Sequence, residues 1–169
     1  MRRLLLDCCL VLCLSIAVPV GPWAATGSDA INTWYVRPSG TCTFNGDGLA
    51  YGCAASAGAT GAFNGFTNIL WTPILGVDKG DTLYVCGSHS TMLAPTGSGV
   101  EGSPIILRGD CPFDHGTINT VGLTDITDGI QLLDVDWFTI RNFDRLSGNR
   151  QAILVYSTGA LHSGFVIQD

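Results

Sequence analysis

Short apolar runs of four to six residues recur along the second half of the chain, each bounded by Gly, Asp, Asn or Ser. The runs occupy residues 82–85, 104–107, 129–133, 137–140, 152–156 and 164–167. No helical pattern separates them, which argues against a sheet built from alternating strands and helices. Equivalent positions recur at spacings of 22, 23 and 27 residues, as in the pairs Leu83–Ile105, Ile130–Ile153 and Ile140–Ile167. This recurrence predicts a solenoid whose coils each contribute short strands.

The composition supports one all-β domain. Of the 169 residues, 46% are hydrophobic, only 13% are charged and 22 are glycine. So little charge argues against a coiled coil, a helical bundle and a charged disordered tail. The net charge of -6 argues against a nucleic-acid partner, which would be held through phosphate contacts.

The spacing also predicts a register for the coils. Alternate side chains of each strand should point inward and lie about 4.8 Å from their counterparts in the next coil. With a spacing of 22 residues, Leu83 stacks on Ile105 and Val85 on Leu107. The expected inward positions are Leu83, Val85, Ile105, Leu107, Ile130, Leu132, Phe138, Ile140, Ile153 and Val155.

Residues 1–25 read as a secretory signal peptide. Arg2 and Arg3 precede an apolar run over residues 4–20, and small residues follow around Ala25. The alternative is a transmembrane anchor, but a span of roughly 17 residues is short for one. The sequence therefore predicts a secreted, periplasmic or cell-surface protein with no stable membrane anchor after cleavage.

Four cysteines remain after that cleavage: Cys42, Cys53, Cys86 and Cys111. An even number in an exported chain predicts two disulfides with three possible connectivities. Cys42 with Cys53 closes a short glycine-rich loop, which leaves Cys86 with Cys111. In the register above, Cys86 and Cys111 are offset by three residues, or roughly 10 Å along the strands. That separation is too large for a disulfide unless the chain turns at a glycine. A zinc site is the alternative, but the cysteines and histidines lack ligand spacing.

The segment before the coils has a different character. Residues 32–36 read as a strand, and residues 40–66 form a long irregular stretch. Residues 66–75 contain the only plausible helical turn, which a proline at 73 ends or bends. The aromatic side chains here, Phe63, Phe66 and Trp71, are expected in the core. We therefore divide the chain into a strand and cap region at 26–81 and coils at 82–169. The sequence stops in the middle of a coil, which predicts that it is the N-terminal part of a longer protein.

Several motifs resemble the right-handed parallel β-helix proteins of the pectate-lyase-like superfamily. They are the opening strand at 34–40, the Gly-Asp turn and strand at 80–85, the segment at 102–109, and the coil repeats at 129–143, 152–153 and 165–167. The resemblance covers about residues 34–40 and 80–169. It implies a β-helix with a cap, but residues 41–79 depart from the family pattern: this cap is irregular, longer and cysteine-bearing.

The resemblance also implies a function. Such proteins handle extracellular polysaccharide, often as lyases that cleave uronic-acid polymers or as glycoside hydrolases. The lyases use Lys or Arg as the base and often a calcium ion held by carboxylates, and the hydrolases use clustered Asp. We expect the N-terminal part of a polysaccharide-acting protein of this kind, with the catalytic coils absent. A non-enzymatic surface module for glycan binding or adhesion is the alternative.

The candidate catalytic residues are Asp134, Asp136 and Arg141. The two carboxylates lie on the same side of an extended segment, where they can bind calcium or act as an acid–base pair. The alternative is a turn between strands in which the aspartates cap backbone amides. Arg141 and Arg145 lie nearby in the sequence, and His162 reads as a turn residue. The other acids considered are Asp125, Asp128 and Asp144.

Overall fold

A computed structural model describes residues 31–122, 127–159 and 161–168. The expected signal peptide at 1–25 and the candidate Asp125 lie outside these residues. In this part of the chain the regular elements are all β-strands, apart from one 3-10 turn, η1 (Phe66–Asn68). The expected helical turn at 66–75 is much shorter than predicted. It ends at Asn68, because the backbone of Ile69 is extended, with φ -69° and ψ 127°. No helix in the described part of the chain is long and apolar enough to cross a membrane.

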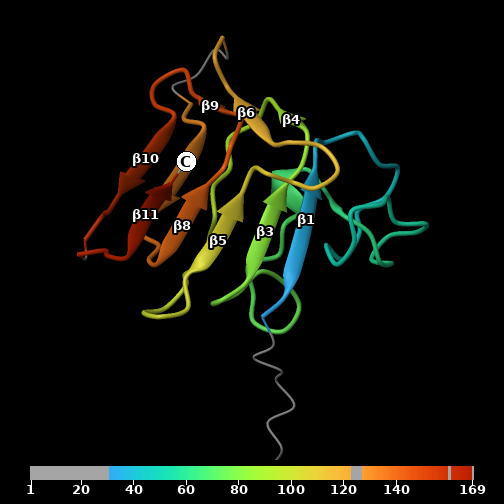
Figure 1. Ribbon diagram of the computed structural model, residues 1–169, viewed down its shortest axis with the longest axis horizontal. Helices are drawn as coiled ribbons and strands as arrows, with labels where there is room; N and C mark the ends of the chain where they lie inside the picture. Colours follow the sequence, from blue (N-terminus) through green and yellow to red (C-terminus); the bar gives the residue numbers. More distant parts are fainter. Residues whose placement is uncertain (1–30, 123–126, 160, 169) are drawn as a thin grey trace, which may run out of the picture.

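Within the described residues, the strands form three sheets in which every strand pair is parallel. A six-stranded sheet has the order β11-β8-β5-β3-β1-β2, and its strands from β11 to β1 run side by side in Figure 1. Its strands are β1 (Thr33–Arg37), β2 (Phe63–Asn64), β3 (Thr82–Val85), β5 (Ile105–Arg108), β8 (Phe138–Arg141) and β11 (Phe165–Gln168). The three-stranded sheet contains β4 (Ser88–His89), β6 (Thr117–Asn119) and β9 (Arg145–Ser147), and the two-stranded sheet contains β7 (Ile130–Leu133) and β10 (Ile153–Tyr156).

The chain visits the sheets in a repeating order. From β5 it passes to β6 in the three-stranded sheet and to β7 in the two-stranded sheet, then returns to the six-stranded sheet as β8. The same order follows through β9 and β10 to β11. The all-β prediction and the parallel strand pairing are confirmed.

Alternation of side chains along the strands forms the core. In β3, Leu83 and Val85 are fully buried while the residues between and before them are only partly buried. Leu107, Ile130, Leu132, Phe138 and Ile140 are at most 2% exposed, as expected for inward positions. Ile153 and Val155 differ from the expectation, since Ile153 is half-buried and Val155 is 44% exposed. Their strand, β10, lies at the edge of its sheet and pairs only with β7 among the described strands.

The predicted register between β3 and β5 is wrong by two residues. Leu83 lies opposite Leu107 rather than Ile105, a spacing of 24 residues. Side chains alternate with a period of two, so a shift of two residues keeps the same residues inward, and the apolar pattern fits both registers equally. The predicted pairs Ile130–Ile153 and Ile140–Ile167 are confirmed.

The observed register accounts for the second disulfide. Tyr84 lies opposite Arg108, so extending the alignment by two residues puts Cys86 opposite Asp110, one residue from Cys111. The expected offset of three residues is thereby reduced to one, and the Cα atoms of the disulfide Cys86–Cys111 are 5.2 Å apart. The disulfide Cys42–Cys53 is also present, with Cα atoms 5.3 Å apart. Two disulfides are consistent with an oxidising compartment.

Candidate functional site

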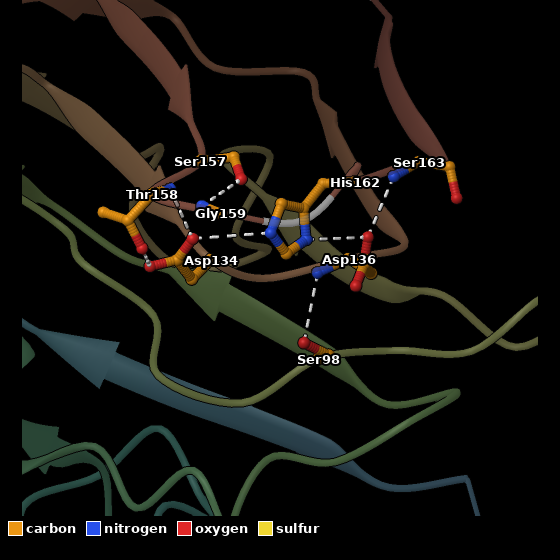
Figure 2. A network of polar contacts seen from close by, with 8 residues as sticks. All are labelled: Ser98, Asp134, Asp136, Ser157, Thr158, Gly159, His162 and Ser163. Atoms are coloured by element: carbon orange, nitrogen blue, oxygen red, sulfur yellow. Dashed lines mark hydrogen bonds and ion pairs between the residues drawn. The ribbon is translucent and has the colours of Figure 1, made fainter.

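The candidate carboxylates Asp134 and Asp136 lie in the turn between β7 and β8 (Figure 2). Asp134 adopts a left-handed backbone with φ 52°, and so does Trp137 with φ 57°. Such conformations cost free energy in a residue with a side chain and persist where surrounding contacts hold them. The turn is held from one side by Ser98, whose Oγ accepts a hydrogen bond from the Asp136 amide at 3.1 Å.

Both carboxylates cap backbone amides of the segment between β10 and β11. The amide and the hydroxyl of Thr158 donate to Asp134 at 2.8 and 2.6 Å. The Ser163 amide donates to Asp136 Oδ1 at 2.8 Å. The Thr158 hydroxyl, followed by its amide, lowers the pKa of Asp134 because both donate to the charged carboxylate. These are the contacts expected from a capping turn.

His162 lies between the two carboxylates. Its Nε2 is 3.4 Å from Asp134 Oδ1 and its Nδ1 is 3.1 Å from Asp136 Oδ1, and the side chain is only 13% exposed. Neither contact has hydrogen-bond geometry, so these are close electrostatic contacts. Figure 2 shows a carboxylate on each side of the ring. The sequence identified His162 as a turn residue but gave no sign that it would sit between these two aspartates.

This arrangement favours a structural role over chemistry. The two carboxylates face opposite edges of the imidazole ring, so a single ion cannot be shared by all three groups. Within residues 31–122, 127–159 and 161–168, no cluster of His, Cys, Asp or Glu can hold a metal ion. These contacts therefore give no support to the calcium site considered from the sequence, and the acid–base pair stays a prediction.

Arg141 lies away from the two aspartates. Arg141 is the last residue of β8, whereas Asp136 lies two residues before that strand begins, so the length of the strand separates the two side chains. Arg141 lies opposite Arg108 of β5 and Gln168 of β11. Its Nε atom is buried and has no hydrogen-bond partner among the described residues. The structure therefore does not bring the three catalytic candidates together.

The other predicted residues also have structural partners. Asp128 is fully buried and accepts a hydrogen bond from Arg150 Nε at 3.0 Å. Asp144 contacts His115 at 3.0 Å on the surface. Arg145 opens β9 opposite Thr117 and is exposed.

A second group of residues, which the sequence did not single out, lies on the outer face of the six-stranded sheet. Tyr35, Tyr84, Arg108 and Arg141 occupy one row across β1, β3, β5 and β8. Their neighbours along each strand are buried, so alternation directs these four side chains away from the core. We call this row the Tyr–Arg face.

Ring contacts extend the Tyr–Arg face towards the cap. The rings of Tyr35 and Tyr84 stack with centroids 5.5 Å apart, and the Arg108 guanidinium lies 5.1 Å from the Tyr84 centroid. Phe113 lies 6.2 Å from Tyr35 and stacks on Tyr51 at 4.3 Å. Phe113 is 61% exposed, which is unusual for a phenylalanine in a row of packed rings.

The charge on the face is partly balanced. Arg108 Nε donates to Asp110 Oδ1 at 2.8 Å, and Asn142 donates to Asp110 Oδ2 at 2.9 Å. The bonds from Arg108, followed by the bond from Asn142, lower the pKa of Asp110 to about 2. Arg141 adds a second cation one strand away. The signal was present in the sequence as Tyr or Arg alternating with buried residues, but only the correct register aligns these positions.

Comparisons with protein-family models, with curated proteins and with solved structures found no match for this chain.

Proposed function

We propose that the protein is a secreted right-handed parallel β-helix protein that binds acidic polysaccharide through the Tyr–Arg face. The observation that carries the proposal is the row of Tyr35, Tyr84, Arg108 and Arg141, extended by the exposed ring of Phe113. The binding alternative considered from the sequence is thus the one that the geometry favours. Lyase or hydrolase activity stays a prediction.

The repeating order of the strands supports the β-helix. Each passage from the six-stranded sheet through the three-stranded and two-stranded sheets would be one coil, and the three sheets would be its faces. The parallel bridge between Leu93 and Ile130 extends the same order one coil towards the N-terminus, between β4 and β5. A solenoid presents equivalent positions of successive coils in a line, which suits a ligand that is itself a linear polymer.

The chemistry of the face supports a sugar ligand with negative charge. Aromatic rings provide flat apolar surfaces on which the C–H faces of sugar rings can stack. Guanidinium groups recognise carboxylates through paired hydrogen bonds. The four strands place rings at one end of a row and cations at the other, over roughly 14 Å at the usual strand spacing.

Removal of the exposed ring tests this proposal. In the Phe113→Ala variant, binding to polygalacturonate, alginate or chondroitin sulfate should weaken about three- to tenfold, the loss of one aromatic contact. Because Phe113 is 61% exposed, the substitution should leave the fold intact. Leu75→Ala is the matched control, since Leu75 is 70% exposed and is not part of the Tyr–Arg face.

The measurement is isothermal titration calorimetry or affinity electrophoresis of the purified protein, with neutral dextran as the comparison ligand. We expect the Leu75 variant to bind as the parent does and dextran to bind weakly. Unchanged binding by the Phe113 variant, or equal binding of dextran and polygalacturonate, would contradict the proposal.

A further inference from the structure

The two disulfides differ sharply in their exposure to solvent. Cys86 and Cys111 are at most 1% exposed, so that disulfide is enclosed in the fold. Cys42 is 5% exposed, but its partner Cys53 lies on the surface. A thiol in solution can therefore approach the residue Cys53, whereas both cysteines of the pair Cys86–Cys111 are enclosed.

A cation lies beside the exposed disulfide. Arg37 Nη1 is 3.2 Å from Cys53 Sγ and 3.8 Å from Cys42 Sγ. Arg37 ends β1, which fixes its backbone, and its guanidinium lies 4.8 Å from the Tyr51 ring centroid. A guanidinium at this distance stabilises a thiolate, and a stabilised thiolate leaves a disulfide faster.

We propose that Cys42–Cys53 is a site of thiol–disulfide exchange with external thiols of the glutathione type. The external thiolate attacks Cys53 Sγ, and a new sulfur–sulfur bond forms there. The Cys42–Cys53 bond breaks, and its electron pair goes to Cys42 Sγ, which leaves as a thiolate beside Arg37. The product is a mixed disulfide on Cys53 with a reduced Cys42. Attack by Cys42 on the mixed disulfide restores the original bond and releases the external thiol.

The fold can survive this reaction because backbone hydrogen bonds hold the loop that the disulfide closes. The amide of Gly48 donates to Gly61 O at 2.7 Å, and the amide of Ala62 donates to Gly52 O at 2.8 Å. The Gly48 carbonyl accepts from the Tyr35 amide of β1 at 2.8 Å. Since Cys42 and Cys53 are only 11 residues apart, opening their bond releases a short segment already attached to the sheet.

The test uses the folded protein and reduced glutathione at neutral pH, with alkylation of free thiols at timed intervals and peptide mass spectrometry. We expect glutathione on Cys53, alkylated Cys42 and an intact Cys86–Cys111 bond, while the far-ultraviolet circular dichroism stays constant. The buried disulfide is the internal control. Both disulfides opening together, or the adduct forming on Cys42, would overturn the proposal.

Substitution of Arg37 separates the effect of the cation from simple exposure. Arg37→Gln should slow the exchange about three- to tenfold, and Arg37→Lys, which keeps the charge, should retain most of the rate. An unchanged rate in Arg37→Gln would overturn the role of Arg37.

Discussion

Lowering the pH should destabilise the protein through one buried histidine. His89 is 3% exposed, its ring stacks on Phe66 with centroids 4.0 Å apart, and its Nε2 donates to the Cys86 carbonyl at 3.2 Å. Burial lowers the pKa of His89 from 6.5 to about 4, because the charged form loses its hydration. The folded protein therefore keeps His89 neutral at pH values where the unfolded chain has bound a proton.

The sign and size follow from this difference. Because the folded pKa lies below the unfolded one, the contribution is fully present above pH 6.5 and is lost as the pH falls towards 4. Between pH 7 and 5 the free energy of unfolding should fall by about 2 kcal/mol from this group. The pKa of Asp110, lowered to about 2, makes that carboxylate contribute mainly below this window.

Urea denaturation followed by tryptophan fluorescence, at half-unit steps from pH 7 to 5, measures this effect. His89→Gln removes the titrating group and should flatten the dependence over this range. His115→Gln is the control, since His115 is exposed and its ion-pair partner within the described residues is the exposed Asp144. If the His89 variant shows the same slope as the unaltered protein, His89 is not the group responsible and the reasoning fails.

Two further predictions concern the core and the buried disulfide. Leu107→Asp should destabilise the protein by several kcal/mol and make it sensitive to protease, because Leu107 is fully buried. Ile106→Asp on the opposite face should cost much less, and equal protease resistance of the Leu107 variant and the parent would contradict the inward position of Leu107. Replacing Cys86 and Cys111 with Ala removes the closure of a 25-residue segment and should lower the free energy of unfolding by about 3.5 kcal/mol. Calorimetry should show a Tm lower by about 7–14 °C, and a change below about 2 °C would count against a stabilising role of this disulfide.

The sequence predicted the longer strands well and the short ones poorly. Runs such as 82–85 and 152–156 are short apolar segments next to turn residues, and each contains a strand of the structure. The strands β2, β4, β6 and β9 have only two or three residues, too few for alternation to be recognised. Their positions depend on pairing with neighbouring strands, which local pattern does not encode.

The candidate site was harder to predict because it depends on register and on long-range contacts. The Tyr–Arg face exists only when Tyr84 aligns with Arg108, and the apolar pattern did not distinguish this register from one shifted by two residues. His162 lies in the segment between β10 and β11, which is not a strand, so the alternating apolar pattern gives no information on where its side chain lies relative to Asp134 and Asp136. The capping role of the two aspartates was among the alternatives that the sequence offered.

The most direct test of the account is to locate the bound sugar. Chemical-shift mapping of the isotope-labelled protein with a short galacturonate oligomer reports which residues the ligand approaches. We expect the largest changes at Tyr35, Tyr84 and Arg108 on the Tyr–Arg face and at the neighbouring Phe113. Changes centred instead on the turn that holds Asp134, Asp136 and His162 would contradict the account.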